Sequence, residues 1–530
     1  MSSMLQKLPI GVQSFAHLRQ EGYLYVDKTK YIHELVNGSK QYFLSRPRRF
    51  GKSLFLSTLK AYWQGQKELF SGLYIAAEEE KSARPWQAYP VFVFDFNGKN
   101  YRKAQALENV LDEKLRGWEQ EYALSGTQSL EERFRLLLAA AKEKSGRPCV
   151  VLVDEYDKPL LDVMADETLA EHNKAVFKGF FGVLKSFDEY LQFVFITGVT
   201  KFSKVSIFSD LNHLKDISMN KKYAAICGIT ENELTDTLWP QVEKFAEVQG
   251  KTAKDCQQKL RRTYDGYHFH PQGEGVYNPF SLLNALDDGE LRSYWFVTGT
   301  PTFLIKKLQD GEFDLWKFTD GKLYSDERAL ADYRADNPDI LPLLYQTGYL
   351  TIVGYDDRRQ RLTMGFPNEE VKYGFLESLM PAYTPKAVPG TDTDIFTLDD
   401  YVENGNVDGI RQILTALFAS IPYTSAGTRF EHYFATVIYL VFTLLGKYVH
   451  SEVHNSQGRA DCILETAAYV YIFEFKLDKS AQEALAQIEE KGYALPYAAD
   501  KRKIYRIGVN FSSESRNIAA WEVRGQNQML

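Results

Sequence analysis

Short apolar runs alternate with longer amphipathic stretches along the first 200 positions of this chain. Four runs have the length and the aromatic and β-branched content of strands: 42–44, 91–96, 149–153 and 193–196. The stretches that separate or follow them predict helices at about 52–63, 104–123, 130–144 and 173–190. This alternation predicts a doubly wound α/β domain, whose ligand lies at the carboxyl ends of parallel strands.

A glycine–lysine–serine motif stands between the first strand and its helix, where a phosphate-binding loop is expected. Backbone N–H groups at the start of the helix face the anion, Lys52 reaches the β- and γ-phosphates, and Ser53 helps to hold Mg²⁺. Arg46 stands where the first glycine of such a loop is usually found. That departure weakens the motif on its own, because glycine eases the turn out of the strand.

Acidic and polar residues follow the third and fourth strands. Asp154 is expected to bind Mg²⁺ through water, and Glu155 to orient or polarise the attacking water. Thr197 ends the fourth strand and is a candidate sensor of the γ-phosphate. An ordinary helix start also explains the two acids, since acids favour helix N-termini. Together the three signals predict nucleotide binding and hydrolysis.

A second α/β pattern lies near the C-terminus. The run 470–476 reads as a strand whose alternation places Glu474 and Lys476 on the same face as Val470 and Ile472. Burying either charge alone is costly, so we expect the two to be paired, metal-bound or at the mouth of a cleft. Asp461, on a preceding strand at 459–464, is expected beside Glu474 across a hairpin. Two carboxylates and a lysine suit a hard divalent cation with an activated water, and a structural salt bridge is the alternative.

This pattern resembles the PD-(D/E)xK nuclease superfamily in the order of its elements. A helix at about 430–445 carries Glu431, where many of these nucleases place a further acidic ligand, and the helix at 481–493 carries Gln487, before a strand at 505–511. The resemblance implies a metal held by Asp461, Glu474 and Glu431. It also implies that Lys476 positions or activates water and that Gln487 orients the substrate backbone or the lysine.

Four motifs, at 46–53, 154–157, 197–199 and 264–267, together resemble the bacterial AAA-ATPase-like family. Members of that family often carry a C-terminal PD-(D/E)xK domain, and they carry arginine in place of the first P-loop glycine. The resemblance implies a catalytic role for Glu155 and Mg²⁺ at Ser53 and Asp154. It implies nucleotide contacts from Arg46, Arg49, Gly51, Lys52, Ser53, Asp154 and Thr197.

The expected organisation is an α/β fold with several domains. An AAA-like P-loop ATPase domain covers 1–228, a helical lid region 229–335 and a winged-helix-like segment 336–380. In that segment a helix at 341–347 precedes a charged hairpin, and few basic residues favour packing over DNA binding. A linker at 381–410 then leads to a PD-(D/E)xK, restriction-endonuclease-like α/β domain at 411–530.

Composition limits the function classes. The chain has 530 residues, 44% hydrophobic and 25% charged, which is typical of several globular domains. Its net charge of −7 excludes a general coat of nucleic-acid-binding charge, so such binding needs a local basic groove. The four scattered cysteines suggest neither disulfides nor a zinc knuckle. With no signal pattern at the N-terminus and no apolar stretch long enough to span a bilayer, we expect a cytoplasmic protein without membrane contact.

The leading hypothesis is an ATP-binding, ATP-hydrolysing, metal-dependent nuclease acting in defence or genome maintenance. It would use ATP and Mg²⁺, with Mn²⁺ as an alternative at the nuclease site, and would cleave nucleic acid, with DNA favoured over RNA. A second hypothesis is a nucleotide-dependent switch that binds a partner or nucleic acid through a non-cleaving nuclease-fold module. Strandedness, coupling of hydrolysis to cleavage, and assembly into a homo-oligomer stay open.

Overall fold

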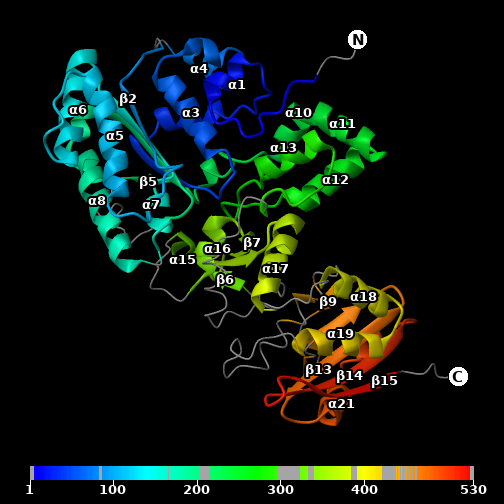
Figure 1. The fold of residues 1–530 in the computed structure, drawn as a ribbon. Helices are drawn as coiled ribbons and strands as arrows, with labels where there is room; N and C mark the ends of the chain where they lie inside the picture. Colours follow the sequence, from blue (N-terminus) through cyan, green and yellow to red (C-terminus); the bar gives the residue numbers. More distant parts are fainter. Residues whose placement is uncertain are drawn as a thin grey trace. The chain divides into compact units, whose positions relative to one another are not determined.

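In the computed structural model the chain folds into two compact units (Figure 1). The first comprises Met1–Thr298 and Leu323–Val371, and the second Gly299–Lys322 and Lys372–Leu530. Within them the structure describes residues 5–82, 86–164, 166–201, 214–296, 323–331, 339–383, 391–419, 437, 440, 441, 443, 448–450, 454–455, 458–459 and 462–525. None of the helices in these ranges combines the length and the apolar composition needed to cross a bilayer.

A five-stranded parallel sheet forms the centre of the first unit, in the order β2-β3-β4-β1-β5. The strands are β1 (Gln41–Ser45), β2 (Val91–Asp95), β3 (Cys149–Asp154), β4 (Leu191–Gly198) and β5 (Lys215–Asp216). The parallel sheet confirms the α/β expectation, and β3 is buried at every position, as a central strand should be. β5 spans two residues and had no counterpart among the expected strands.

Helices connect these strands and cover the sheet. The long ones are α3 (Lys52–Trp63), α5 (Ala106–Glu121), α6 (Leu130–Ser145) and α8 (Glu167–Ser186), and the shorter ones are α1 (Phe15–Gln20), α2 (Thr29–Val36), α4 (Tyr74–Lys81) and α7 (Lys158–Leu161). α8 begins six residues before its expected start, because the Asp166 side chain accepts the Leu169 N–H and caps it there. Helices α5, α6 and α8 lie together (Figure 1). The rings of Phe134 on α6 and Phe180 on α8 stack with centroids 4.8 Å apart, and both contact the Phe94 ring of β2.

Four helices follow the sheet: α10 (Glu231–Thr237), α11 (Trp239–Gln249), α12 (Ala253–Tyr264) and α13 (Pro279–Asp288). Thr230 and Glu233 open α10 with a reciprocal capping box. The helices share a core of buried apolar residues that includes Leu234, Phe245 and Leu282. The role of this region as a lid stays a prediction.

The last part of the first unit contains β6 (Leu323–Ser325), α15 (Glu327–Ala331), α16 (Leu341–Thr347), β7 (Thr351–Asp356) and β8 (Arg361–Gly365). Its three strands are antiparallel in the order β6-β8-β7. The helix and hairpin lie where the sequence predicted them, and their assignment as a winged helix stays a prediction. The boundary between the two units falls within α17 (Glu369–Tyr383).

The second unit contains a mixed sheet in the order β15-β14-β13-β12-β9. Its strands are β9 (Tyr448–His450), β12 (Cys462–Glu465), β13 (Tyr469–Leu477), β14 (Lys503–Ser512) and β15 (Asn517–Gly525), and a separate ribbon pairs β10 (His454–Asn455) with β11 (Gly458–Arg459). β13 and β14 are parallel and are connected through α21 (Ala481–Glu490), while the other pairs are antiparallel. From β12 to β14 these elements follow the order expected for the C-terminal domain, while most of the helix expected at 430–445 lies outside the described residues.

The segment expected to be a linker at 381–410 contains α18 (Thr391–Glu403) and the first residues of α19 (Val407–Ala419). Leu398 and Val402, one helical turn apart, are fully buried, and the Tyr471 hydroxyl donates to the Val402 carbonyl. The Phe418 ring packs against Phe511 of β14. These contacts make α18 and α19 part of the folded second unit.

Gly508→Ala tests how closely α21 packs on the sheet. A Cβ on Gly508 would collide with the Ala481 carbonyl oxygen and lie 2.9 Å from the Leu485 nitrogen, two backbone atoms that cannot rotate away. We expect the substitution to lower the free energy of unfolding by roughly 1–3 kcal/mol, measured by urea denaturation. The matched control is Gly525→Ala on β15, whose Cβ would meet its nearest neighbour at 3.9 Å. Equal losses in both variants would contradict this packing.

Candidate functional site

A cavity of about 490 Å³ lies over the loop between β1 and α3. Residues from six parts of the first unit line it: segment 9–13, loop 48–54, Asn97 after β2, the residues after β3, Val199 after β4, and the first two turns of α13. It therefore lies at the carboxyl ends of the parallel strands, where ligands of open α/β sheets bind. Segment 9–13 and α13 carried no ligand signal in the sequence, because their place in the wall depends on tertiary packing.

The expected phosphate-binding residues Gly51, Lys52 and Ser53 all line this cavity. Gly51 caps α3 with φ +91°, a left-handed conformation that glycine adopts without strain. The Lys52 ammonium is buried and donates to the Arg46 and Pro47 carbonyls at 3.0 and 3.1 Å. An incoming phosphate would compete with these two carbonyls for the same cation.

Two carboxyl groups stand at the end of β3 beside this lysine. Burial raises the pKa of Asp154. A hydrogen bond from Ser53 and the charge of Lys52 both lower this pKa, but the effect of burial is larger. Burial also raises the pKa of Glu155, whose backbone has φ +48° and whose N–H donates to an Asp154 oxygen at 3.0 Å. The structure thus brings together Ser53, Asp154, Glu155 and Lys52. A hydroxyl and a carboxylate side by side are suitable oxygen ligands for Mg²⁺.

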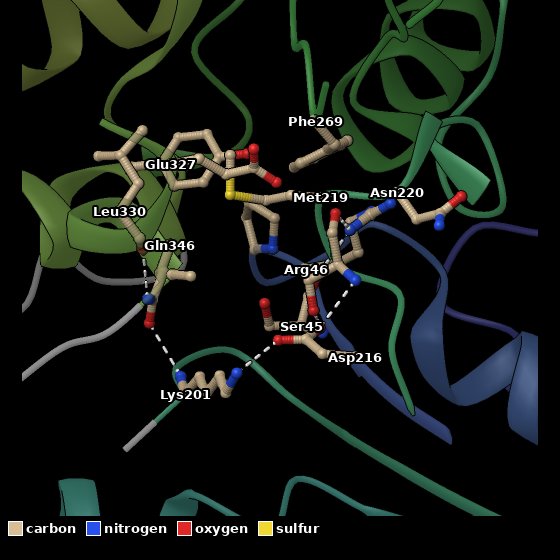
Figure 2. A pocket seen from close by; sticks show the side chains of 14 residues that line it. Ser45, Arg46, Lys201, Asp216, Met219, Asn220, Phe269, Glu327, Leu330 and Gln346 are labelled. Atoms are coloured by element: carbon tan, nitrogen blue, oxygen red, sulfur yellow. Dashed lines mark hydrogen bonds and ion pairs between the residues drawn. The ribbon is translucent and has the colours of Figure 1, made fainter. Parts of the chain in front are cut away.

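Arg46 is not itself among the residues that line this cavity, although its carbonyl accepts a hydrogen bond from Lys52. Its guanidinium is 1% exposed and donates to the carbonyls of Ser218, Tyr223 and Ala224. It also stacks on the Phe269 ring at 4.0 Å, and burial lowers its pKa. Figure 2 shows Arg46 in the wall of a second cavity, of about 240 Å³. The Arg46 side chain thus holds the start of the loop to segment 218–224, and the nucleotide contact that the resemblance implied stays a prediction.

Two other expected nucleotide contacts differ in position. Arg49 lines the larger cavity and has φ +68°, with its guanidinium 4.6 Å from the Phe280 ring of α13. Thr197 is fully buried at the end of β4, and its hydroxyl has no hydrogen-bond partner among the described residues.

Asp157 belongs to the motif at 154–157, but sequence reasoning assigned it no individual role. It lines the larger cavity and is 1% exposed. Its carboxylate accepts the N–H groups of Val199 and Thr200 and the Thr200 hydroxyl, at 2.7–3.2 Å. The loop after β3 is therefore fixed to the loop after β4. The sequence signal that could have indicated this role is a third acidic residue two positions after Glu155, close to the end of β3.

In the second unit, Glu474 and Lys476 form an ion pair on β13, with Nζ 2.8 Å from Oε1. The glutamate side chain is 1% exposed and the lysine side chain 17%. Val470 and Ile472 of the same face enter a core with Leu485 and Ile488 of α21, which confirms the expected alternation. The Gln487 amide lies 3.4 Å from the Tyr493 hydroxyl.

Asp461 and Glu431 lie outside the described residues. Among the residues that are described, no cluster of three or more histidine, cysteine and acidic side chains is arranged to hold a metal ion. The metal site expected in this unit therefore stays a prediction that depends on Asp461.

Comparison with known proteins gives two family matches and one curated relative. Residues 9–208 match the family model described as "Predicted AAA-ATPase", and residues 429–521 match the model of the PD-(D/E)XK nuclease superfamily. The relative, described as "Uncharacterized protein in vnfD 5'region" of Azotobacter chroococcum mcd 1, is 37% identical over 535 residues. The match covers 98% of this chain and 99% of that protein.

A buried carboxyl group supports the wall of the larger cavity from behind. Glu370 is 3% exposed, and its Oε1 accepts the Trp295 N–H at 2.8 Å and the Ser281 hydroxyl of α13 at 3.0 Å. The Trp295 indole in turn donates to the Arg48 carbonyl of the phosphate-binding loop. Burial raises the pKa of Glu370 from 4.5 to about 7.

This raised pKa predicts a pH dependence of stability. Between pH 4.5 and about 7 the folded protein keeps a proton on Glu370 that the unfolded chain has released, so its contribution to stability falls as pH rises through that window. We expect Glu370→Gln, which carries no charge, to gain roughly 3 kcal/mol over wild type across the window, measured by urea denaturation at several pH values. Glu369→Gln, the partly exposed neighbour, is the control. Parallel pH profiles for wild type and Glu370→Gln would contradict the assignment.

Proposed function

Because the chain belongs to the family of AAA-ATPase-like proteins with a C-terminal PD-(D/E)XK nuclease superfamily domain, we propose that it hydrolyses ATP and cleaves nucleic acid with a divalent metal ion. The observation that carries the proposal is the wall of the 490 Å³ cavity, where Lys52, Ser53 and Glu155 meet at the carboxyl ends of β1 and β3. The larger cavity is of the size that small-molecule ligands occupy.

In the ATPase half, Lys52 exchanges its two loop carbonyls for the β- and γ-phosphates, and the N–H groups at the start of α3 complete the anion site. Ser53 and Asp154 hold Mg²⁺, which neutralises phosphate charge when it is bound. Glu155 orients the attacking water, and Thr197 senses the γ-phosphate. The apolar side chains of Ile10, Val12, Phe280 and Leu283 face the remaining space, where the base fits.

In the nuclease half, Glu474 offers a nearly buried carboxylate beside Lys476, which retains partial access to solvent. Asp461 directly precedes Cys462, whose backbone pairs with Phe473, the neighbour of Glu474. Asp461 and Glu474, with Glu431, hold a metal ion that lowers the pKa of its bound water. Lys476 positions that water and stabilises charge on the phosphate, and Gln487 orients the substrate. We further propose that the protein is cytoplasmic and that its nucleic-acid substrate is DNA.

One observation favours a second candidate, a nucleotide-dependent switch whose nuclease fold binds without cleaving. Lys476 and Glu474 neutralise each other at 2.8 Å, as in a structural salt bridge, and the chain carries a net charge of −7. Cleavage assays separate the two candidates.

Lys52→Ala tests the ATPase half. The substitution removes the cation that meets the phosphates, and we expect the Kd for ATP in the presence of Mg²⁺ to rise at least about tenfold, measured by isothermal titration calorimetry. Lys60→Ala, on the exposed face of the same helix α3, is the matched control and should bind like wild type. Unchanged ATP affinity in Lys52→Ala would contradict the assignment.

Asp461→Ala and Lys476→Ala test the nuclease half. We expect each to abolish metal-dependent cleavage in a panel of single- and double-stranded DNA and RNA, because one removes a metal ligand and the other the cation beside the water. ATP binding should remain at the wild-type level, since Lys52 and Asp154 are untouched. Lys479→Ala, three residues beyond Lys476, is the control. Cleavage that persists in both variants at the wild-type rate would exclude this site as its source.

A further inference from the structure

The last turn of α16 touches two loops of the nucleotide site. Gly348 ends the helix with φ +91°, and a Cβ there would lie 2.7 Å from the Cβ of Pro47, so the backbone at this point is packed against the phosphate-binding loop. Two residues earlier, Gln346 is 5% exposed. Its Oε1 accepts the Lys201 N–H at 2.8 Å, and its Nε2 donates to the Leu330 carbonyl of α15 at 2.8 Å.

Lys201 is connected to the nucleotide site through the residues that follow β4. It follows Thr197 by four residues, and the Val199 and Thr200 N–H groups between them are bound to Asp157. Gln346 therefore holds the far end of a loop whose near end lies beside Glu155 and Thr197.

The same lysine also connects this loop to the phosphate-binding loop. The Lys201 ammonium pairs with Asp216 of β5 at 2.7 Å, and Figure 2 shows Lys201 between Asp216 and Gln346. Asp216 accepts the Ser218 N–H, and the Ser218 carbonyl accepts from Arg46. A displacement of the loop after β4 thus reaches the side chain of Gln346 through one hydrogen bond, and a displacement of the phosphate-binding loop reaches it through four polar contacts in series.

We propose that Gln346 is a positioning residue of the ATPase site, which holds the exit of β4 in place for hydrolysis and transmits its movement to α15 and α16. A carboxamide suits this task because it offers an acceptor for the Lys201 N–H and a donor for the Leu330 carbonyl at once. The inference rests on the proposed function and adds to it that the nucleotide acts on cleavage, through this residue. It concerns a side chain that has no contact with the nucleotide cavity itself.

Two substitutions separate the two hydrogen bonds. Gln346→Leu removes both, and we expect kcat for ATP hydrolysis to fall on the order of tenfold, because a displaced β4 exit misplaces Thr197. The Kd for ATP should stay within about threefold of wild type, since Lys52 is unaffected. Gln346→Glu keeps the acceptor for Lys201 but places an oxygen against the Leu330 carbonyl. That variant should hydrolyse ATP near the wild-type rate and lose the effect of ATP on nucleic-acid cleavage, which Gln346→Leu also loses.

Gln241→Leu is the matched control, because Gln241 is also a helical glutamine that is 5% exposed, on α11. It should leave kcat unchanged. Metal-dependent cleavage without ATP should be the same in all variants. If kcat of Gln346→Leu matches that of Gln241→Leu, or if Gln346→Glu retains the ATP effect on cleavage, the inference is overturned. If wild type itself fails to hydrolyse ATP, the proposed function fails, which is a separate result.

Discussion

A guanidinium buried where β1 ends holds the loop between β1 and α3 in place. Removing a charge from water costs several kcal/mol, and that cost is offset only where donors and cation meet well-placed partners. Arg46 meets three carbonyls from segment 218–224 and the face of Phe269. A glycine at this position would leave those carbonyls without their donor. Arg46 therefore fixes the start of the loop to segment 218–224. The end of the loop, with Gly51 and Lys52, lines the cavity.

Around this anchor, the loops of the site are tied to one another by hydrogen bonds from buried side chains. Asp157 joins the ends of β3 and β4, and Glu370 joins α13 to Trp295, which binds the phosphate-binding loop. Burial raises the pKa of both Asp154 and Glu155, while Lys52 acts in the opposite direction. When Lys52 turns to a phosphate, the acids lose part of that compensation, and a divalent cation is the natural replacement.

The parts of the fold that local pattern determines were predictable, and the parts that depend on distant partners were not. The apolar runs located β1, β3 and β13 within two residues, and α16 was predicted with the bounds observed, because its Gly348 ends the helix. Gly51, Lys52 and Ser53 followed from motif spacing. The bracing role of Arg46 depends on carbonyls more than 170 residues away, which no local pattern reveals. The sequence suggested a linker at 381–410, whereas α18, which lies within it, is held by burial of Leu398 and Val402.

The cost of removing charge from water also applies to the end of β13, where Glu474 and Lys476 lie. Val470 and Ile472 continue an apolar face into the core under α21, and two more apolar residues would extend that face without any cost of desolvation. The chain instead places Glu474 and Lys476 there, one of them with 1% of its side chain exposed. A salt bridge that served stability alone would gain little over such apolar residues. Charge retained at the end of a buried strand face is what a metal-dependent phosphodiesterase requires, and for that reason we favour cleavage over docking.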